Sequence, residues 1–246
     1  MIANKKKECW SPPLILAIDN STMYGNVALT SPDGLLAEHS LLSRLTHSKR
    51  LLASLENMLQ ENELDWHQLD ALAVCLGPGS FTGLRIGLAT IKGIAMATGL
   101  PLIGISSLDG LACQLPFARH QICPLLDARK HEIYTAFYQS SKDGVVERQG
   151  RYLVMPPEEL LQIIDQPTIF VGDGVNVYGE LLKEGLGSKA LFAPEHIIFP
   201  RAATIGKLAL ERFGQKEFLD PALAVPLYIR ASDAEIQRRK KMAAAL

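Results

Sequence analysis

Residues 71–83 read ALAVCLGPGSFTG, an apolar run followed by a loop with three glycines. The apolar run predicts a buried strand, and an apolar segment of helical period at residues 81–98 predicts a long helix after it. A glycine loop at this junction can turn backbone N–H groups toward an anion, or it can be a tight turn without a ligand. The loop matches no nucleotide motif, because Thr82 replaces the third glycine of the dinucleotide fingerprint and the Gly-Lys pair of a Walker A loop is missing.

The order of segments around this loop recurs later in the chain. An apolar run that ends in an aspartate opens each half: LILAID at residues 14–19 and PLLD at residues 124–127. A hairpin with an Asp-Gly turn follows each run, and TIFVGDG at residues 168–174 then repeats the strand and the glycine loop. We interpret the recurrence as an internal duplication, although any α/β chain can produce such a coincidence.

The predicted fold class is therefore α/β, with two duplicated lobes. We assign residues 1–115 and a return at residues 217–246 to the first lobe, and residues 116–216 to the second lobe. We expect helices at residues 48–60, 81–98, 108–115, 156–164 and 201–213, a further helix after residue 174, and a final polar helix at residues 231–241.

The composition limits the classes of function. The chain has 246 residues, of which 48% are hydrophobic and 21% are charged, and its formal net charge is −1. That apolar fraction supports a packed core and excludes wholesale disorder. The balanced charge excludes a broad basic face for non-specific binding of nucleic acid. The basic run at residues 238–241 is either a solvated helix end or a minor contact to phosphate.

Cysteine spacing and hydropathy indicate a location. The four cysteines contain no C-x-x-C pair, which is typical of proteins in the reducing cytoplasm. The apolar run at residues 13–18 is too short for a secretory signal and lacks a cleavage site. The most apolar stretch, residues 83–108, contains Arg85 and Lys92, so we expect no membrane span.

Two neighbouring helices have contrasting faces. Residues 48–60 place their large apolar side chains on one stripe. The helix at residues 81–98 is apolar almost all round, and Ala89, Gly93 and Ala97 form a line without bulk at i, i+4 and i+8. Another helix backbone could approach such a line closely. The alternatives are packing within the chain and a face that is offered to a partner subunit.

Asp19 and Asp127 each end the first strand of a predicted lobe, where they could face a cleft. Either carboxylate could hold a hydrated metal ion or a phosphate, and the alternative is an Asx-type turn in which it accepts backbone N–H bonds. No two of the six histidines lie four residues apart, so the chain has no H-x-x-x-H helix face and we expect no metal site.

Five segments together make the chain similar to the TsaB (YeaZ) family, and the similarity covers roughly residues 14–230. The segment at residues 77–87 is highly specific, whereas those around Asp19 and Asp127 alone are generic. The segments are ILAIDNST at residues 15–22, GPGSFTGLRIG at residues 77–87, GISSL at residues 104–108, LDAR at residues 126–129 and PLYIR at residues 226–230. The resemblance implies the actin/Hsp70/sugar-kinase (ribonuclease H-like) fold and a part in making threonylcarbamoyladenosine on tRNA.

The resemblance also implies partners. The chemistry would belong to a TsaD-like catalytic paralogue that binds metal through an H-x-x-x-H pair, whereas this chain has ISSLD at residues 105–109 where those histidines would stand. The family's heterodimer contact uses helices that match residues 48–60 and 81–98, and a TsaE-like ATPase engages the pair. The residues that we expect to bind the partner are Leu51, Leu52, Leu55, Met58, Leu59, Arg85, Leu88, Ala89, Lys92, Gly93 and Ala97.

We therefore expect a non-catalytic scaffold subunit of the tRNA threonylcarbamoyladenosine (t6A) modification complex, without catalytic residues or a metal. It would bind and activate the TsaD-like paralogue, help to dock the TsaE-like ATPase, reach tRNA only through the complex, and form a homodimer when alone. The resemblance implies no required cofactor. The alternatives are an ATP-dependent sugar-type kinase or ATPase of the same fold, with Asp19 or Asp127 as its base, and a metallopeptidase. The residues that could still bind ATP or ADP weakly are Asp19, Ser21, Gly77, Gly79, Gly172 and Gly174.

Overall fold

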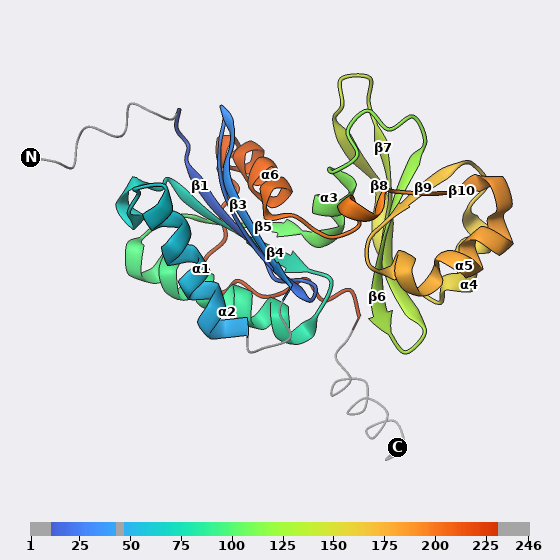
Figure 1. Ribbon diagram of the computed structural model, residues 1–246, viewed down its shortest axis with the longest axis horizontal. Coiled ribbons are helices and arrows are strands. Elements are labelled where there is room, and N and C mark those ends of the chain that lie inside the picture. The colour runs from blue at the N-terminus through green and yellow to red at the C-terminus, as the bar shows by residue number, and fades with distance from the viewer. Residues whose placement is uncertain (1–10, 43–46, 231–246) are drawn as a thin grey trace, which may run out of the picture.

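The computed structural model describes residues 11–42 and 47–230, and it contains two five-stranded sheets side by side (Figure 1). The first sheet has the strand order β3-β2-β1-β4-β5. Its strands are β1 (Ile15–Asp19), β2 (Tyr24–Ser31), β3 (Gly34–Leu42), β4 (Ala71–Gly77) and β5 (Leu102–Ser106). The second sheet has the order β10-β9-β6-β7-β8. Its strands are β6 (Gln121–Arg129), β7 (Glu132–Ser140), β8 (Val146–Met155), β9 (Thr168–Val171) and β10 (Ala190–Phe192).

The two sheets share one topology, which confirms the predicted duplication. In the first sheet β1 and β3 pair antiparallel with β2, while β1 and β5 pair parallel with β4. In the second sheet β6, β7, β8, β9 and β10 repeat these pairings in the same order. The hairpin expected at the second Asp-Gly turn is formed by β7 and β8, although the sequence pattern predicted no bounds for β8 and did not predict β10. Most of β8 is polar and exposed, and β10 has only three residues, so neither strand has a clear apolar pattern.

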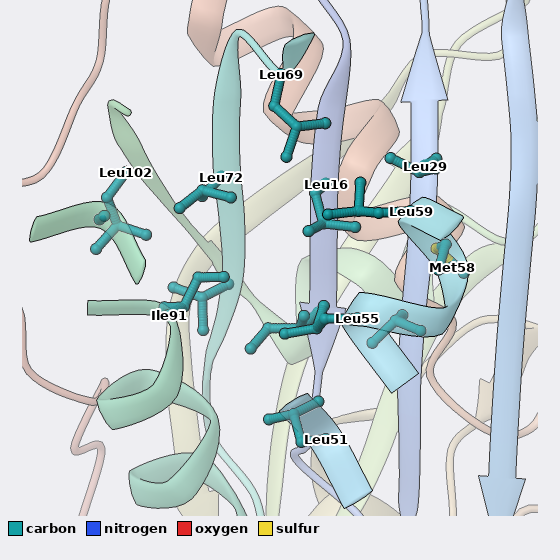
Figure 2. Close-up of a cluster of buried hydrophobic side chains, with 14 of the residues drawn as sticks. Leu16, Leu29, Leu51, Leu55, Met58, Leu59, Leu69, Leu72, Ile91 and Leu102 are labelled. Atoms are coloured by element: carbon teal, nitrogen blue, oxygen red, sulfur yellow. The ribbon is translucent and has the colours of Figure 1, made fainter. Parts of the chain in front are cut away.

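Helices α1 (His47–Glu61) and α2 (Phe81–Thr98) cover one face of the first sheet. The strand β1 is buried on both faces, so alternate side chains enter different cores. Leu16 and Ile18 pack with α1 and α2, as Figure 2 shows for Leu16 beside Leu59. Ile15 and Ala17 point to the opposite face, which helix α6 (Ala202–Gly214) covers.

The expected placement of residues 202–214 in the second lobe is wrong. Ile205 and Ala209 of α6 lie in the same apolar cluster as Ile15 and Ala17 of the first sheet. Both faces of a central strand must be covered, and α1 and α2 cover only one face of β1. The chain therefore returns to the first lobe at α6 rather than at residue 217.

In the second lobe, α4 (Pro157–Ile163) and α5 (Gly174–Leu186) pack on one face of the sheet. The opposite face is covered by α3 (Ser107–Ala112), which follows directly after β5 of the first sheet. Three short 3-10 helices lie at Trp66–Gln68, Gly187–Lys189 and Glu195–Ile197. The helix predicted at residues 231–241 and the basic run at residues 238–241 lie outside the described residues. Among the helices that the structure describes, none is long and apolar enough to span a bilayer.

Candidate functional site

The glycine loop between β4 and α2 packs directly on the turn between β1 and β2. A Cβ at Gly79 would stand 2.2 Å from the carbonyl oxygen of Ser21, and the φ angle of Gly79 is +154°. The amide of Ser80 donates to that same oxygen at 2.6 Å. On the other side of the contact, the Asn20 side-chain amide donates to the carbonyl of Gly83 at 2.9 Å. Because Gly79 and Gly83 have no side chain, the backbone of the loop can lie in direct contact with the backbone of the β1–β2 turn.

The second lobe repeats this contact. A Cβ at Gly172, whose φ angle is +126°, would stand 2.2 Å from the carbonyl oxygen of Leu125 on β6. A Cβ at Gly174 would stand 2.9 Å from the same oxygen. Each glycine loop thus packs on the first strand of its own lobe or on the turn after it. Close backbone packing explains why glycine stands at these positions. This is the tight turn without a ligand that the sequence left open beside an anion site.

Asp19 lies at the end of β1 and is completely buried. Its Oδ1 accepts hydrogen bonds from the amide of Ser21 at 2.8 Å and from the Ser21 hydroxyl at 2.6 Å. These bonds form the Asx-type turn that was the alternative to a ligand site. Burial raises the pKa of Asp19, and the bonds from Ser21 lower it by less. Burial, together with the Asp19 charge, also raises the pKa of the neighbouring Cys75 thiol.

Asp127 at the end of β6 is engaged within its own lobe. Its Oδ2 lies 3.1 Å from Nη1 of Arg129, and its backbone amide donates to Oδ1 of Asp173 at 3.2 Å. Burial raises the pKa of Asp173. Asp19 is therefore enclosed in the first lobe, whereas Asp127 forms an ion pair with the exposed Arg129 in the second.

The residues proposed for nucleotide binding form one group in the first lobe and another in the second lobe. Gly77 precedes the loop whose Gly79 meets Ser21, beside Asp19, in the first lobe. Gly172 and Gly174 meet Leu125 in the second lobe. Within the described part of the chain, no group of three or more His, Cys, Asp or Glu side chains could hold a metal ion.

The line of small residues on α2 lies on the surface. Ala89, Gly93 and Ala97 are all exposed, and a Cβ at Gly93 would meet no atom within 4 Å. Met96, which the sequence did not single out, is 69% exposed beside them. On α1, Leu52 is the expected partner-binding residue that is exposed, at 43%. We call these five exposed apolar residues, four on α2 and one on α1, the apolar α1/α2 face.

The other apolar residues expected to bind a partner lie in the core of the first lobe. The apolar stripe of α1 faces the sheet, because an amphipathic helix covers its own sheet first. Figure 2 shows Leu51, Leu55, Met58 and Leu59 directed toward β1 and β2. The structure therefore places these side chains, and that of Leu88, in the core of the lobe and not on its surface. The exposed fractions are 5% for Leu51, 0% for Leu55, 0% for Met58, 3% for Leu59 and 5% for Leu88.

Arg85 and Lys92, on the flank of α2, contact the segment at residues 222–228. Nζ of Lys92 donates to the carbonyl oxygens of Ala224 at 2.9 Å and of Ala222 at 3.2 Å. The guanidinium of Arg85 lies 3.7 Å from the centre of the Phe81 ring and donates to the Tyr228 hydroxyl at 3.4 Å. No sequence signal predicted these contacts, because the partners are more than a hundred residues apart along the chain.

Comparison with known proteins places the chain in a family. The family model described as "TsaD: tRNA N6-adenosine threonylcarbamoyltransferase" matches residues 41–238. The protein named "tRNA threonylcarbamoyladenosine biosynthesis protein TsaB" from Bacillus subtilis is 31% identical over 229 residues, which are 90% of this chain and 96% of that protein. The solved structure of YeaZ from Pseudomonas aeruginosa is 28% identical, with a TM-score of 0.76 over 89% of this chain and 100% of that one.

A more distant structure supports the fold alone. The activator of 2-hydroxyisocaproyl-CoA dehydratase from Clostridium difficile, solved with bound ADPNP, has a TM-score of 0.50 at 11% identity. It covers 84% of this chain and 98% of that one. The expected duplicated fold is thus confirmed, and likeness at this identity carries no function across.

Proposed function

Because the chain belongs to the TsaB (YeaZ) family of tRNA threonylcarbamoyladenosine biosynthesis proteins, we propose that it is a non-catalytic subunit that binds a TsaD-like paralogue. In this proposal the paralogue carries out the threonylcarbamoyl transfer. The chain contributes a surface that binds the paralogue and holds its lobes in the active arrangement.

The exposed small-residue line on α2 is the observation that carries the proposal. Gly93 lowers the helix propensity of α2 by about 1 kcal/mol relative to alanine, and none of the residues that the structure describes would contact a Cβ at this position. A glycine that no intrachain contact requires fits a surface that a second helix backbone approaches closely. Met96 and Leu52 add apolar area on the same α1/α2 face.

The core position of Leu51, Leu55, Met58, Leu59 and Leu88 narrows the proposed interface. These side chains fix α1 and α2 on the sheet and thereby set the spacing of the exposed face. The residues that would touch the paralogue are Leu52, Ala89, Gly93, Met96 and Ala97, with Arg85 and Lys92 on the flank.

Several finer expectations belong to the same proposal. The TsaE-like ATPase would dock on the assembled pair, tRNA would be reached through the complex, and the site of action would be the cytoplasm, where tRNA is modified. Without the paralogue, the apolar α1/α2 face would pair with a second copy of the chain. Binding of ATP or ADP would be weak and is not required by the scaffold role.

Co-purification with the TsaD-like paralogue tests the proposal. The substitution Gly93→Trp places a large ring in the middle of the α1/α2 face and should abolish capture of the paralogue while the chain remains folded. Gly214→Trp is the matched control, because a Cβ there also meets nothing within 4 Å and α6 lies on the opposite face of the sheet. Capture of the paralogue by the Gly93→Trp variant at the wild-type yield would contradict the proposed interface.

A further inference from the structure

Residues 219–230, here called the C-terminal strap, run from the edge of the first sheet to the second lobe. The strap begins where the amide of Leu219 donates to the carbonyl of Leu102 on β5 at 2.8 Å. Further along, the amide of Leu227 donates to the carbonyl of Leu76 on β4 at 2.8 Å. Figure 1 shows this red segment passing α2 on its way to the second lobe.

Lys92 is the contact that fixes the strap on α2. Its ammonium group bridges the carbonyl oxygens of Ala222 and Ala224, and the Ala224 side chain is buried in the core of the first lobe. The amide of Ala222 donates to Oδ1 of Asp220 at 2.8 Å, which closes a turn just before the bridge. The strap is thus held from both sides at the point where it passes the flank of the α1/α2 face.

The far end of the strap is attached to the second lobe. Ile229 packs against the apolar cluster beneath that sheet, and Nη1 of Arg230 lies 2.5 Å from Oε2 of Glu132. Glu132 is the first residue of β7, directly after the turn that joins β6 to β7.

That turn has a backbone conformation which requires support from its surroundings. Arg129, Lys130 and His131 have φ angles of +61°, +55° and +59°. Residues other than glycine rarely adopt such angles, and each costs of order 1–3 kcal/mol. His131 contacts Glu158 at 2.6 Å on one side of the turn, and the Arg230–Glu132 ion pair lies on the other. The strap therefore ends beside a turn of costly backbone conformation, next to side-chain contacts from α4 and from Arg230.

We propose that the strap couples the flank of α2 to the β6–β7 turn, so that a change at either end alters the stability of the other. The part of this proposal that concerns a partner rests on the proposed function. Binding of the paralogue beside Lys92 would stabilise the contacts of the strap and, through them, the β6–β7 turn. Coupling of this kind is reciprocal, so each end can be changed while the other is measured.

Backbone amide hydrogen exchange of the full chain, read by mass spectrometry, tests the coupling. Lys92→Met should raise exchange in peptides covering residues 129–135 by about threefold or more. Arg230→Gln should in turn raise exchange at residues 220–226. The matched controls are Lys207→Met on the exposed side of α6 and Arg151→Gln on β8, which lose the same charges away from the strap and should leave both segments unchanged.

A second arm adds the TsaD-like paralogue. Binding should slow exchange at residues 129–135 in the wild-type chain and do so less in the Lys92→Met variant. If the paralogue binds and the turn does not respond, the part of the proposal that concerns a partner is overturned and the proposed function stands. If the paralogue does not bind, the proposed function is contradicted, and the chain-alone comparison still decides the coupling. Equal exchange in both variants, their controls and the wild type would overturn it.

Discussion

Tyr138 on β7 donates a hydrogen bond of 2.7 Å to the carboxylate of Asp109 on α3, and so joins a strand of the second sheet to the helix that follows the first. Tyr152 on β8 donates to the other carboxylate oxygen at 2.8 Å, and Nη2 of Arg212 on α6 lies 3.9 Å from it. Asp109 is the last residue of the ISSLD segment at residues 105–109. Here the segment ends in a hydrogen-bonded link between the lobes.

This link should contribute measurably to stability. Tyr138→Phe removes a buried hydrogen bond to a carboxylate, so we expect the free energy of unfolding to fall by about 1.5–3 kcal/mol. The measurement is urea denaturation followed by circular dichroism. Tyr228→Phe is the control, because that residue is half-exposed and its hydroxyl accepts only long hydrogen bonds, at 3.4 Å from Nε and Nη2 of Arg85. Its effect should stay within about 0.5 kcal/mol. Equal losses for the two variants would contradict the link.

The two classes of glycine should respond oppositely to alanine. Gly79→Ala forces a Cβ to within 2.2 Å of the Ser21 carbonyl at a φ angle of +154°, so we expect a loss of about 2–4 kcal/mol. Gly93→Ala adds a methyl group in open space within α2 and should stabilise the chain by up to about 1 kcal/mol. Thermal denaturation of both variants beside the wild type checks the pair. A stable Gly79→Ala variant would mean that the loop is not held against the β1–β2 turn.

The carboxyl group of Asp19 should make stability depend on pH. Its pKa is raised by burial, so the folded chain binds the proton more tightly than the unfolded chain, whose aspartate pKa is about 3.9. The resulting stabilisation is complete below that value and is lost as the pH rises through the raised pKa.

The variant Asp19→Asn isolates this effect. The difference in unfolding free energy, wild type minus variant, should decrease from pH 4 upward, because every other titrating group is common to both proteins. Denaturation in urea over a series of pH values provides the measurement. Parallel curves for the two proteins would show that Asp19 titrates normally in the folded chain.

Nucleotide binding separates the scaffold from the kinase alternative. A kinase site with a micromolar dissociation constant would stabilise the chain by about 4.1 kcal/mol when the Mg-ATP concentration is about a thousand times that constant. The packed glycine loops and the enclosed Asp19 lead us to expect weak binding at most, with a stabilisation of about 0.4 kcal/mol at a concentration equal to the dissociation constant. A thermal-shift titration with Mg-ATP and Mg-ADP measures this. A large shift together with turnover would favour the kinase.

Activity assays test the non-catalytic role. We expect no threonylcarbamoyladenosine on tRNA when this chain is supplied alone with the reaction components, and product when the TsaD-like paralogue is added. The Gly93→Trp variant should fail to support the paralogue, and Gly214→Trp should support it as the wild type does. Product formed by this chain without a partner would overturn the scaffold role.

Local sequence patterns predicted much of the fold. The two runs that end in Asp19 and Asp127, and the glycine loops that follow later in each half, predicted a duplicated α/β chain, and the two sheets share that topology. These features were readable because strand burial and tight turns are properties of short segments. The exposed line of Ala89, Gly93 and Ala97 was equally visible, since helical period alone puts the three residues on one side of α2.

Hydrophobic periodicity does not show which element covers an apolar face, and this limited the prediction of the partner-binding residues. It showed a leucine stripe on α1 but not that β1 and β2 already cover it, and so not that Leu55 and Met58 lie in the core. The sequence also did not predict three long-range contacts: the packing of α6 on β1, the hydrogen bonds from Lys92 to the strap, and the hydrogen bond from Tyr138 to Asp109. Each joins residues far apart along the chain, and only three-dimensional packing determines which of them meet.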